Sequence, residues 1–353
     1  MKYFEKYISN TLAGSANQSW FSPDGETVTG RVFYKIFAGG TYDYSILFSN
    51  VIDSTFSDGL HSHRNLVCDE WEILSASVCV TKNACPEGCK SFKEITFDGK
   101  KTKTVMPGEF FCTDEIEISA EKGDFLCVEL TVKGQMMPYH HEIIVPVFTK
   151  DQNGWVEDVK MPVPSMIGCN RKPKLKVGFL GDSITQGIGT EVNSYAHWNS
   201  RLADMFGEEY SYWNLGIGYA RANDAATDGA WLFKAKQMDA VVVCMGVNDT
   251  IKGQSAKQIK NDLQTITEKL HQAGIRVLVQ TVPPFDFDEE KEKIRLEVNR
   301  FILNELEADA KFDNNGVLAD GNRSIYGGHP DAEGCRKWAE ALCPVMKEFL
   351  LGK

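Results

Sequence analysis

The chain has 353 residues, and at about 150 residues per domain this length indicates two domains. Hydrophobic residues make up 42% of the chain and charged residues 25%, ordinary values for a globular protein, which exclude a disordered or fibrous chain. The 49 acidic residues outnumber the 38 basic ones, so the net charge is −11, and no dense basic patch offsets it. Because such a surface repels phosphate backbones, we expect no nucleic acid partner.

The sequence also predicts a cytoplasmic protein that does not enter a membrane. No stretch approaches the roughly 20 apolar residues of a membrane span, and the opening MKYFEKYISN has no apolar core of a secretory leader. The ten cysteines are irregularly spaced, so we expect reduced thiols that pack as small hydrophobic groups. Cys85 and Cys89 have the look of half a zinc site, but no second pair matches them, and we interpret them as incidental thiols in a turn.

Residues 1–165 show the pattern of an all-β domain. Short strand-like runs alternate with turn residues such as Asp98-Gly99-Lys100, and no long helical pattern interrupts them. Many short strands with regular turns are typical of a β-sandwich or jelly roll. The predicted strands are 31–37, 44–48, 71–80, 94–97, 115–118, 125–132 and 142–148.

Residues 174–353 show a different pattern, in which apolar strands alternate with amphipathic helices. Residues 151–173 contain three prolines and are interpreted as a surface linker between the two domains. The alternation predicts an α/β domain with a parallel sheet covered by helices on both faces. Ser255 and Asp331 are expected to begin two of the helices. The predicted strands are 175–180, 210–215, 240–245 and 275–281, and the predicted helices are 196–206, 223–236, 255–273, 289–309 and 331–350.

Three polar residues follow the predicted strands or open the last helix, where ligands of α/β sheets bind. Ser183 follows the first strand, Asn248 follows the third, and His329 lies in the loop before the last helix. A serine needs a base within hydrogen-bond reach to act as a nucleophile, and a side-chain amide can stabilise an oxyanion. Each residue alone is more typical of a turn or a helix cap, so their joint placement carries the prediction of catalysis.

Other familiar motifs are missing from the sequence. The glycine pairs at 187–189 and 216–218 lack the third glycine of a dinucleotide loop, and there is neither a GxxxxGK phosphate loop nor a GxSxG elbow. We therefore expect no cofactor. His61 and His63 would share a strand face, but no acidic cluster accompanies them, so we expect no metal either.

Four sequence blocks together resemble the SGNH (GDSL-type) hydrolases. They are GDSIT at 181–185, NLGIG at 214–218, GVND at 246–249 and GGHPDAEG at 327–334. Residues 96–130 are similar to the N-terminal β-domain of two-domain SGNH esterases, a group that includes carbohydrate acetylesterases. The resemblance implies a flavodoxin-like three-layer SGNH domain at 174–353, preceded by a β jelly-roll domain at 1–165.

The resemblance also implies a role for each matching residue. Ser183 would be the nucleophile and would offer its N–H to the oxyanion. Asn248 and a backbone N–H after Asn214, from Gly218 or Tyr219, would complete the oxyanion hole. His329 would act as general base and then as general acid toward the leaving alcohol.

The sequence departs from the family pattern at two positions. The family has an acid three residues before the histidine, where this chain has Tyr326. A backbone carbonyl that orients His329 would give a Ser–His dyad, and Asp320 or Asp331, with Asp182 in a supporting place, are the alternative acids. Tyr219 stands where the family has glycine, and its ring would narrow the acyl pocket and favour a small acyl group.

The leading prediction is a serine esterase that removes O-acyl groups, most simply acetyl, from a small substrate such as an acetylated oligosaccharide. A lipase, lysophospholipase or thioesterase on the same core is one alternative, and a non-catalytic carbohydrate-binding protein is the other. Aromatic faces suit sugar rings, so Tyr195, Trp213 and Tyr326 are candidate substrate contacts, with core packing as the alternative for Trp213.

Overall fold

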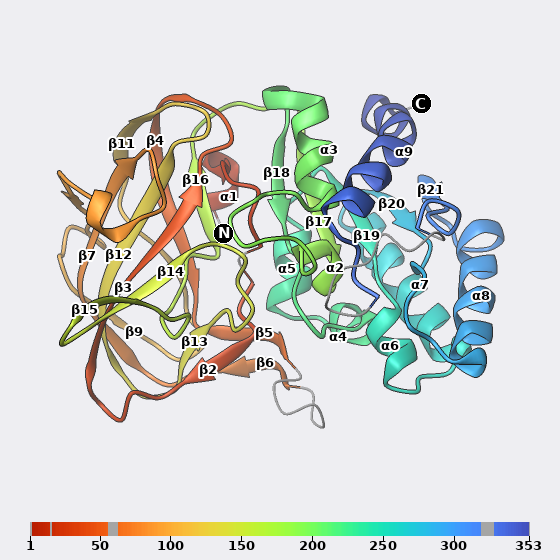
Figure 1. Cartoon of the computed structure of the whole chain (residues 1–353), viewed down its shortest axis with the longest axis horizontal. Coiled ribbons are helices and arrows are strands. Elements are labelled where there is room, and N and C mark those ends of the chain that lie inside the picture. The colour runs from red at the N-terminus through yellow and green to blue at the C-terminus, as the bar shows by residue number, and fades with distance from the viewer. Residues whose placement is uncertain (1, 15, 56–62, 319–327, 353) are drawn as a thin grey trace. The chain divides into compact units, whose positions relative to one another are not determined.

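The computed structural model describes residues 2–14, 16–55, 63–318 and 328–352. The chain divides into two compact units, Met1–Lys172 and Pro173–Lys353, each of which is described by itself (Figure 1). No helix among the described residues is both long enough and apolar enough to cross a membrane.

The N-terminal unit is built mainly from two antiparallel sheets. One contains β1 (Ile8–Ser9), β16 (Met166–Cys169), β4 (Gly40–Ser49), β10 (Phe110–Cys112) and β11 (Ile116–Ala120). The other contains β15 (Gly154–Glu157), β14 (Val147–Asp151), β3 (Thr27–Lys35), β12 (Phe125–Gly134), β7 (Trp71–Thr81), β8 (Lys93–Glu94) and β9 (Lys103–Val105). The remaining elements are α1 (Tyr3–Lys6), the 3₁₀ turn η1 (Pro86–Gly88), and two two-stranded sheets, β2 (Ser19–Phe21) with β13 (Met137–Tyr139) and β5 (Val51–Thr55) with β6 (His63–Val67).

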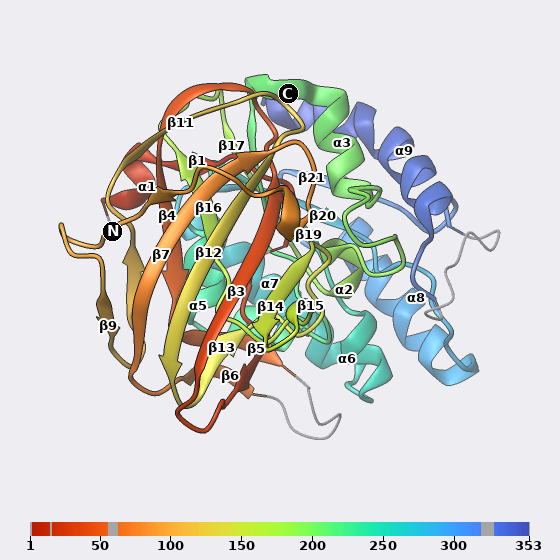
Figure 2. The ribbon, with the colours of Figure 1, turned by 60° about the vertical axis from the view of Figure 1, so that its left-hand side comes forward.

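Side-chain alternation explains the long central strands β3, β12 and β7, which run side by side in Figure 2. Leu126, Val128 and Leu130 share one face of β12 and are almost fully buried. Cys127 lies on the opposite face and is also buried, so this sheet is covered on both sides. The predicted β-rich domain is confirmed, whereas the jelly-roll topology stays a prediction.

The interpretation of 151–173 as a linker is wrong. This segment contributes strands β15 and β16, and β16 pairs with β4, where Met166 lies opposite Leu47. Residues 161–169 are all buried, and β16 lies inside the sheet, between β1 and β4. The predicted strand at 142–148 begins only at Val147.

The C-terminal unit has a parallel five-stranded sheet with helices on both faces. The strand order is β18 (Ser211–Asn214), β17 (Lys176–Gly181), β19 (Ala240–Cys244), β20 (Arg276–Gln280) and β21 (Ala310–Phe312). This is the flavodoxin-like order 2-1-3-4-5, so the predicted three-layer α/β fold is confirmed. The helical elements are α2 (Ser183–Gln186), α3 (Trp198–Phe206), η2 (Gly207–Glu209), α4 (Ala222–Ala226), α5 (Ala230–Ala235), α6 (Val247–Ile251), α7 (Ala256–Gln272), α8 (Glu289–Asn304) and α9 (Ala332–Leu351).

Packing of the helices follows from their apolar faces. Helices α3 and α9 contact one another, with the rings of Trp198 and Trp338 stacked 5.2 Å apart. Ser255 caps α7, as expected, by accepting a hydrogen bond from the Gln258 N–H at 3.3 Å. The helix predicted at 223–236 is two helices, because Gly229 interrupts it and becomes the N-cap of α5.

Candidate active site

Ser183 lies at the carboxyl end of β17, which comes first in the chain among the strands of this sheet and lies between β18 and β19. Asp182 caps the short helix α2 by accepting a hydrogen bond from the Ile184 N–H at 3.0 Å. Only glycine fits at 181, because a Cβ there would lie 2.0 Å from the Thr185 hydroxyl oxygen and 2.6 Å from the Cys244 carbonyl oxygen. This tight strand-to-helix turn fixes the position of Ser183, which retains 9% of its surface exposure.

His329 is brought to Ser183 from the far end of the domain sequence. The Ser183 Oγ and the His329 Nε2 are 2.8 Å apart, hydrogen-bond distance for a nucleophile and its base. The Phe285 ring, from the loop after β20, packs edge-on to the imidazole at a centroid distance of 5.3 Å. A Cβ at residue 328 would lie 2.6 Å from that ring, so a glycine is required immediately before His329.

The turn after β18 brings backbone N–H groups to the same sheet edge. Asn214, to which the sequence analysis gave no role of its own, accepts a hydrogen bond from the Gly216 N–H at 2.8 Å and donates to the Gln186 carbonyl at 3.2 Å. Gly218 follows and is buried. Within the described residues, no hydrogen bond engages the backbone N–H of Gly218 or of Ser183.

Tyr219 follows this turn with an unusual backbone. Its φ is +61°, a left-handed conformation that costs about 1–2 kcal/mol for a residue with a Cβ. Its side chain is 42% exposed. The chain therefore carries a large exposed ring at a position whose conformation favours glycine.

Asn248 lies on α6, after the central strand β19. Its Nδ2 donates one hydrogen bond to the Ala220 carbonyl oxygen at 2.9 Å, which fixes the amide plane. A primary amide has a second N–H to donate, and the Asn248 side chain is only half-buried. The neighbouring Asp249 is fully buried and accepts the Ala222 N–H at 3.0 Å, which ties α6 to α4.

Three buried ionisable groups near this edge have pKa values shifted toward their neutral forms. Burial, aided by the charge of Asp249, raises the pKa of Asp182 to about 7 against the opposing hydrogen bond from the Ile184 N–H. Burial likewise raises the pKa of Asp249 to about 7. Burial lowers the pKa of His197 to about 4, and its Nδ1 lies 2.6 Å from the Asn199 Oδ1, so the neutral imidazole donates to that amide.

The other predicted site residues have different surroundings. Asp331 caps α9 by accepting a hydrogen bond from the Gly334 N–H at 2.7 Å, which employs its carboxylate in the helix start. Trp213 is 2% exposed, so its ring offers no face to a sugar, and the alternative of core packing holds. Tyr195 is half-buried, with a φ of +54°, in the loop before α3. Asp320, Tyr326 and His61 lie outside the described residues.

The described side chains at this edge do not form a cluster of potential metal ligands. Among described residues, the one such group is Cys79, Cys89 and Cys127, in the N-terminal unit. The chemistry that the edge itself offers is a serine hydroxyl beside an imidazole, with backbone and amide N–H donors nearby.

Comparison with known families agrees with this geometry. Residues 179–337 match the model of the GDSL-like Lipase/Acylhydrolase family. The C-terminal unit is a domain of this family. The match spans Ser183, Asn248 and His329, and it confirms the predicted SGNH resemblance and the prediction of an esterase domain.

Individual relatives are more distant. An acetylxylan esterase of Xylanibacter ruminicola is 22% identical over 256 residues, which cover 61% of this chain. The chain spans about half the length of that relative, 49%.

Two solved structures are similar along the whole chain. One is a family two carbohydrate esterase from Cellvibrio japonicus, with a TM-score of 0.43, 13% identity, and coverage of 98% of this chain and 95% of that one. The other is a family two carbohydrate esterase from Clostridium thermocellum in complex with cellohexaose, with a TM-score of 0.42, 12% identity, and coverage of 98% and 100%. At these TM-scores the likenesses add no evidence about chemistry.

Proposed function

We propose that the chain is a serine esterase that removes O-acetyl groups from carbohydrate through an acyl-enzyme. The observation that carries this proposal is the 2.8 Å contact between the Ser183 Oγ and the His329 Nε2 at the carboxyl edge of the sheet. The family match over residues 179–337 supports ester hydrolysis independently of that distance.

The reaction begins when Ser183 attacks the ester carbonyl while His329 accepts the hydroxyl proton. The oxyanion that forms is stabilised by the N–H groups of Ser183 and Gly218 and by the second N–H of the Asn248 amide. His329 then gives its proton to the departing sugar hydroxyl, leaving an acyl group on Ser183. Water, deprotonated by His329, attacks this acyl group and releases acetate and free serine.

We propose that a backbone carbonyl orients His329, which gives a Ser–His dyad. The support is that Asp331 already caps α9 through its bond with the Gly334 N–H. One oxygen of the Asp331 carboxylate is therefore occupied at the start of the helix. Asp320 remains the alternative acid, and under the dyad its substitution by alanine should leave most of kcat in place.

The acyl group and the alcohol are proposed from two further observations. The exposed ring of Tyr219 follows the oxyanion turn, and there it would restrict the acyl pocket to short chains. The similar protein of Xylanibacter ruminicola is an acetylxylan esterase, which supports an acetylated oligosaccharide as substrate. The cytoplasmic location and the absence of a cofactor stay predictions from the sequence.

Hydrolysis of 4-nitrophenyl acetate, butyrate and octanoate by the wild type and Ser183→Ala tests this function. We expect kcat/KM to be highest on acetate and to be lost in the variant. A higher kcat/KM on octanoate would favour a lipase or thioesterase. Failure of both these esters and acetylated xylo-oligosaccharides to give Ser183-dependent turnover would favour a carbohydrate-binding protein.

A further inference from the structure

Three cysteines far apart in the sequence converge in the N-terminal unit. Cys79 on β7 and Cys127 on β12 are directly opposite one another in the antiparallel register. Cys89 follows η1, the short turn between β7 and β8. All three sulfur atoms lie within 4.8 Å of one another, and we call this group the thiol trio.

The spacing of the thiol trio suits a single thiophilic cation. The centre of a triangle with sides of at most 4.8 Å lies within about 2.8 Å of each corner. A zinc–sulfur bond is about 2.3 Å long. Each sulfur would therefore move by on the order of 0.5 Å to coordinate one Zn²⁺ ion.

Two members of the trio are buried among apolar side chains, and the third is more accessible to solvent. Cys79 and Cys127 are 3% and 0% exposed, and they pack with Phe33 and Phe125, while Phe92 covers part of the cluster. Cys89 is only half-buried. A bound ion would thus have two buried ligands and a third near the surface, which leaves its fourth position to water.

Arg31 holds the loop that carries Cys89 against the sheet. Its guanidinium donates to the Pro86 carbonyl oxygen at 2.6 Å and lies 4.8 Å from the Phe92 ring centre. It also pairs with Glu129 at 2.7 Å. The third ligand is therefore positioned by a charged side chain with two further partners of its own.

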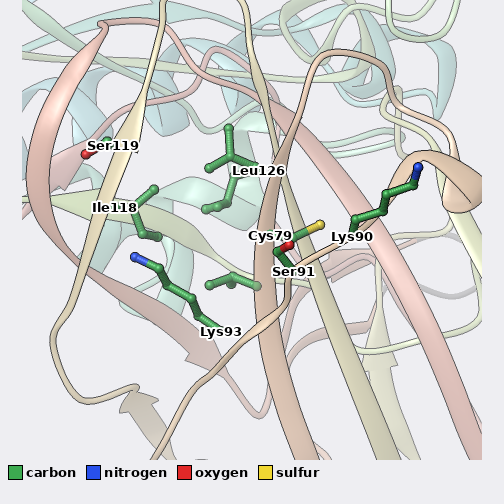
Figure 3. Close-up of a pocket in the computed structure, with 9 residues that line it drawn as sticks. Cys79, Lys90, Ser91, Lys93, Ile118, Ser119 and Leu126 are labelled. Carbon is green, nitrogen blue, oxygen red and sulfur yellow. The ribbon is translucent and has the colours of Figure 1, made fainter.

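A solvent-accessible pocket of about 240 Å³ lies beside β7, and Cys79 is the member of the trio that lines it. Figure 3 shows Cys79 at its wall beside Ser91, with Lys90 and Lys93 on the loop and strand that border it. Leu126, on the face of β12 opposite Cys127, also lines this pocket, so solvent reaches the trio through the half-buried Cys89.

We propose that Cys79, Cys89 and Cys127 form a zinc-binding site in the N-terminal unit, separate from the Ser183 edge. Zn²⁺ would bind the three sulfur atoms as thiolates, and the protons that the thiols carry would leave on binding. The product carries a charge of −1, whereas a monovalent ion would leave −2 in a largely buried place, which favours the divalent ion. The ion would fasten the loop after β7 to the β7–β12 pair.

Titration of the reduced full-length chain with Co²⁺, then Zn²⁺ in competition with a chromogenic chelator, tests the proposal. We expect one ion per chain, thiolate-to-cobalt charge-transfer absorption, and release of protons as Zn²⁺ binds. Cys89→Ser should weaken binding by more than the 10–100-fold typical of losing an outer-shell partner. Cys85→Ser is the matched control, because this thiol is exposed on the same loop and contacts Glu87 at 2.9 Å.

Three results would overturn the proposal. One is that the reduced chain binds neither ion, and another is that Cys85→Ser weakens binding as much as Cys89→Ser does. The third is that a disulfide forms within the trio of the folded chain, that metal binding is then lost, and that reduction of the disulfide does not restore it. Because Cys89 is half-buried, Cys89→Ser is expected to fold, and a circular dichroism spectrum equal to that of Cys85→Ser checks this.

Discussion

Replacement of Asn248 by alanine removes a single proposed oxyanion donor from an otherwise intact site. The Asn248 amide gives one N–H to the Ala220 carbonyl at 2.9 Å, and this bond fixes the direction of the other N–H. Loss of one oxyanion donor typically costs about 2.7–4 kcal/mol of barrier. We therefore expect kcat on 4-nitrophenyl acetate to fall by about 10²–10³-fold in Asn248→Ala.

The stability cost of the same change should be small. Asn248 is half-buried, and the net contribution of one such hydrogen bond is about 0.5–1.5 kcal/mol. We expect the free energy of unfolding to fall by about 1 kcal/mol, far less than the change in barrier. Ile251→Ala is the matched control, because this 40% exposed side chain ends the same short helix and should leave kcat unchanged.

Steady-state kinetics on the acetate ester, together with chemical denaturation, separates the two effects. An oxyanion donor acts mainly in the transition state, so kcat should fall while KM changes little. The reasoning is refuted if kcat falls by less than tenfold, or if KM alone changes, in a variant that is folded.

Three further predictions concern the same domain. Asp331→Asn keeps a capping side chain for the Gly334 N–H, so under the dyad it should retain most of its kcat, and a loss near 10⁴-fold would instead make Asp331 the triad acid. Tyr219→Gly and Tyr219→Ala should both raise the butyrate-to-acetate ratio of kcat/KM. Only the glycine variant avoids the strain of a φ of +61°, so its free energy of unfolding should exceed that of the alanine variant by about 1 kcal/mol. Equal free energies of unfolding in chemical denaturation would contradict this. Asp182 has its pKa raised to about 7, so its contribution to stability is full below the unfolded pKa near 4 and is lost as pH rises through 7. The drop in Tm from pH 5 to pH 8 should therefore be smaller in Asp182→Asn, and an equal drop would count against the shift.

The sheet edge was predictable because its residues obey a local rule. Ser183 and Asn248 each follow a strand, and parallel strands place their carboxyl ends together. His329 is 146 residues from Ser183, so its pairing with Ser183 was predicted from its place in the loop before the last helix and from the family resemblance, not from sequence spacing. The capping role of Asp331 followed from its position at a helix start.

Features that depend on strand register could not be predicted from the sequence. Nothing in the spacing of Cys79 and Cys127 indicates that they lie opposite one another, because the register of β7 with β12 is set by the packing of two long strands. The three-residue strand β21 is too short to give a pattern. The proline-rich segment that contains β15 and β16 was misinterpreted because Pro162 and Pro164 lie between the two strands and Pro173 follows the second.

The most direct test of the proposed serine esterase is labelling of the intact chain with a fluorophosphonate, followed by mass spectrometry. We expect one adduct per chain, mapped to the peptide that contains Ser183 and missing in Ser183→Ala. His329→Ala should label much more slowly, because the 2.8 Å contact that activates the hydroxyl is gone. An unlabelled wild-type chain, or an adduct that persists in Ser183→Ala, would contradict the account.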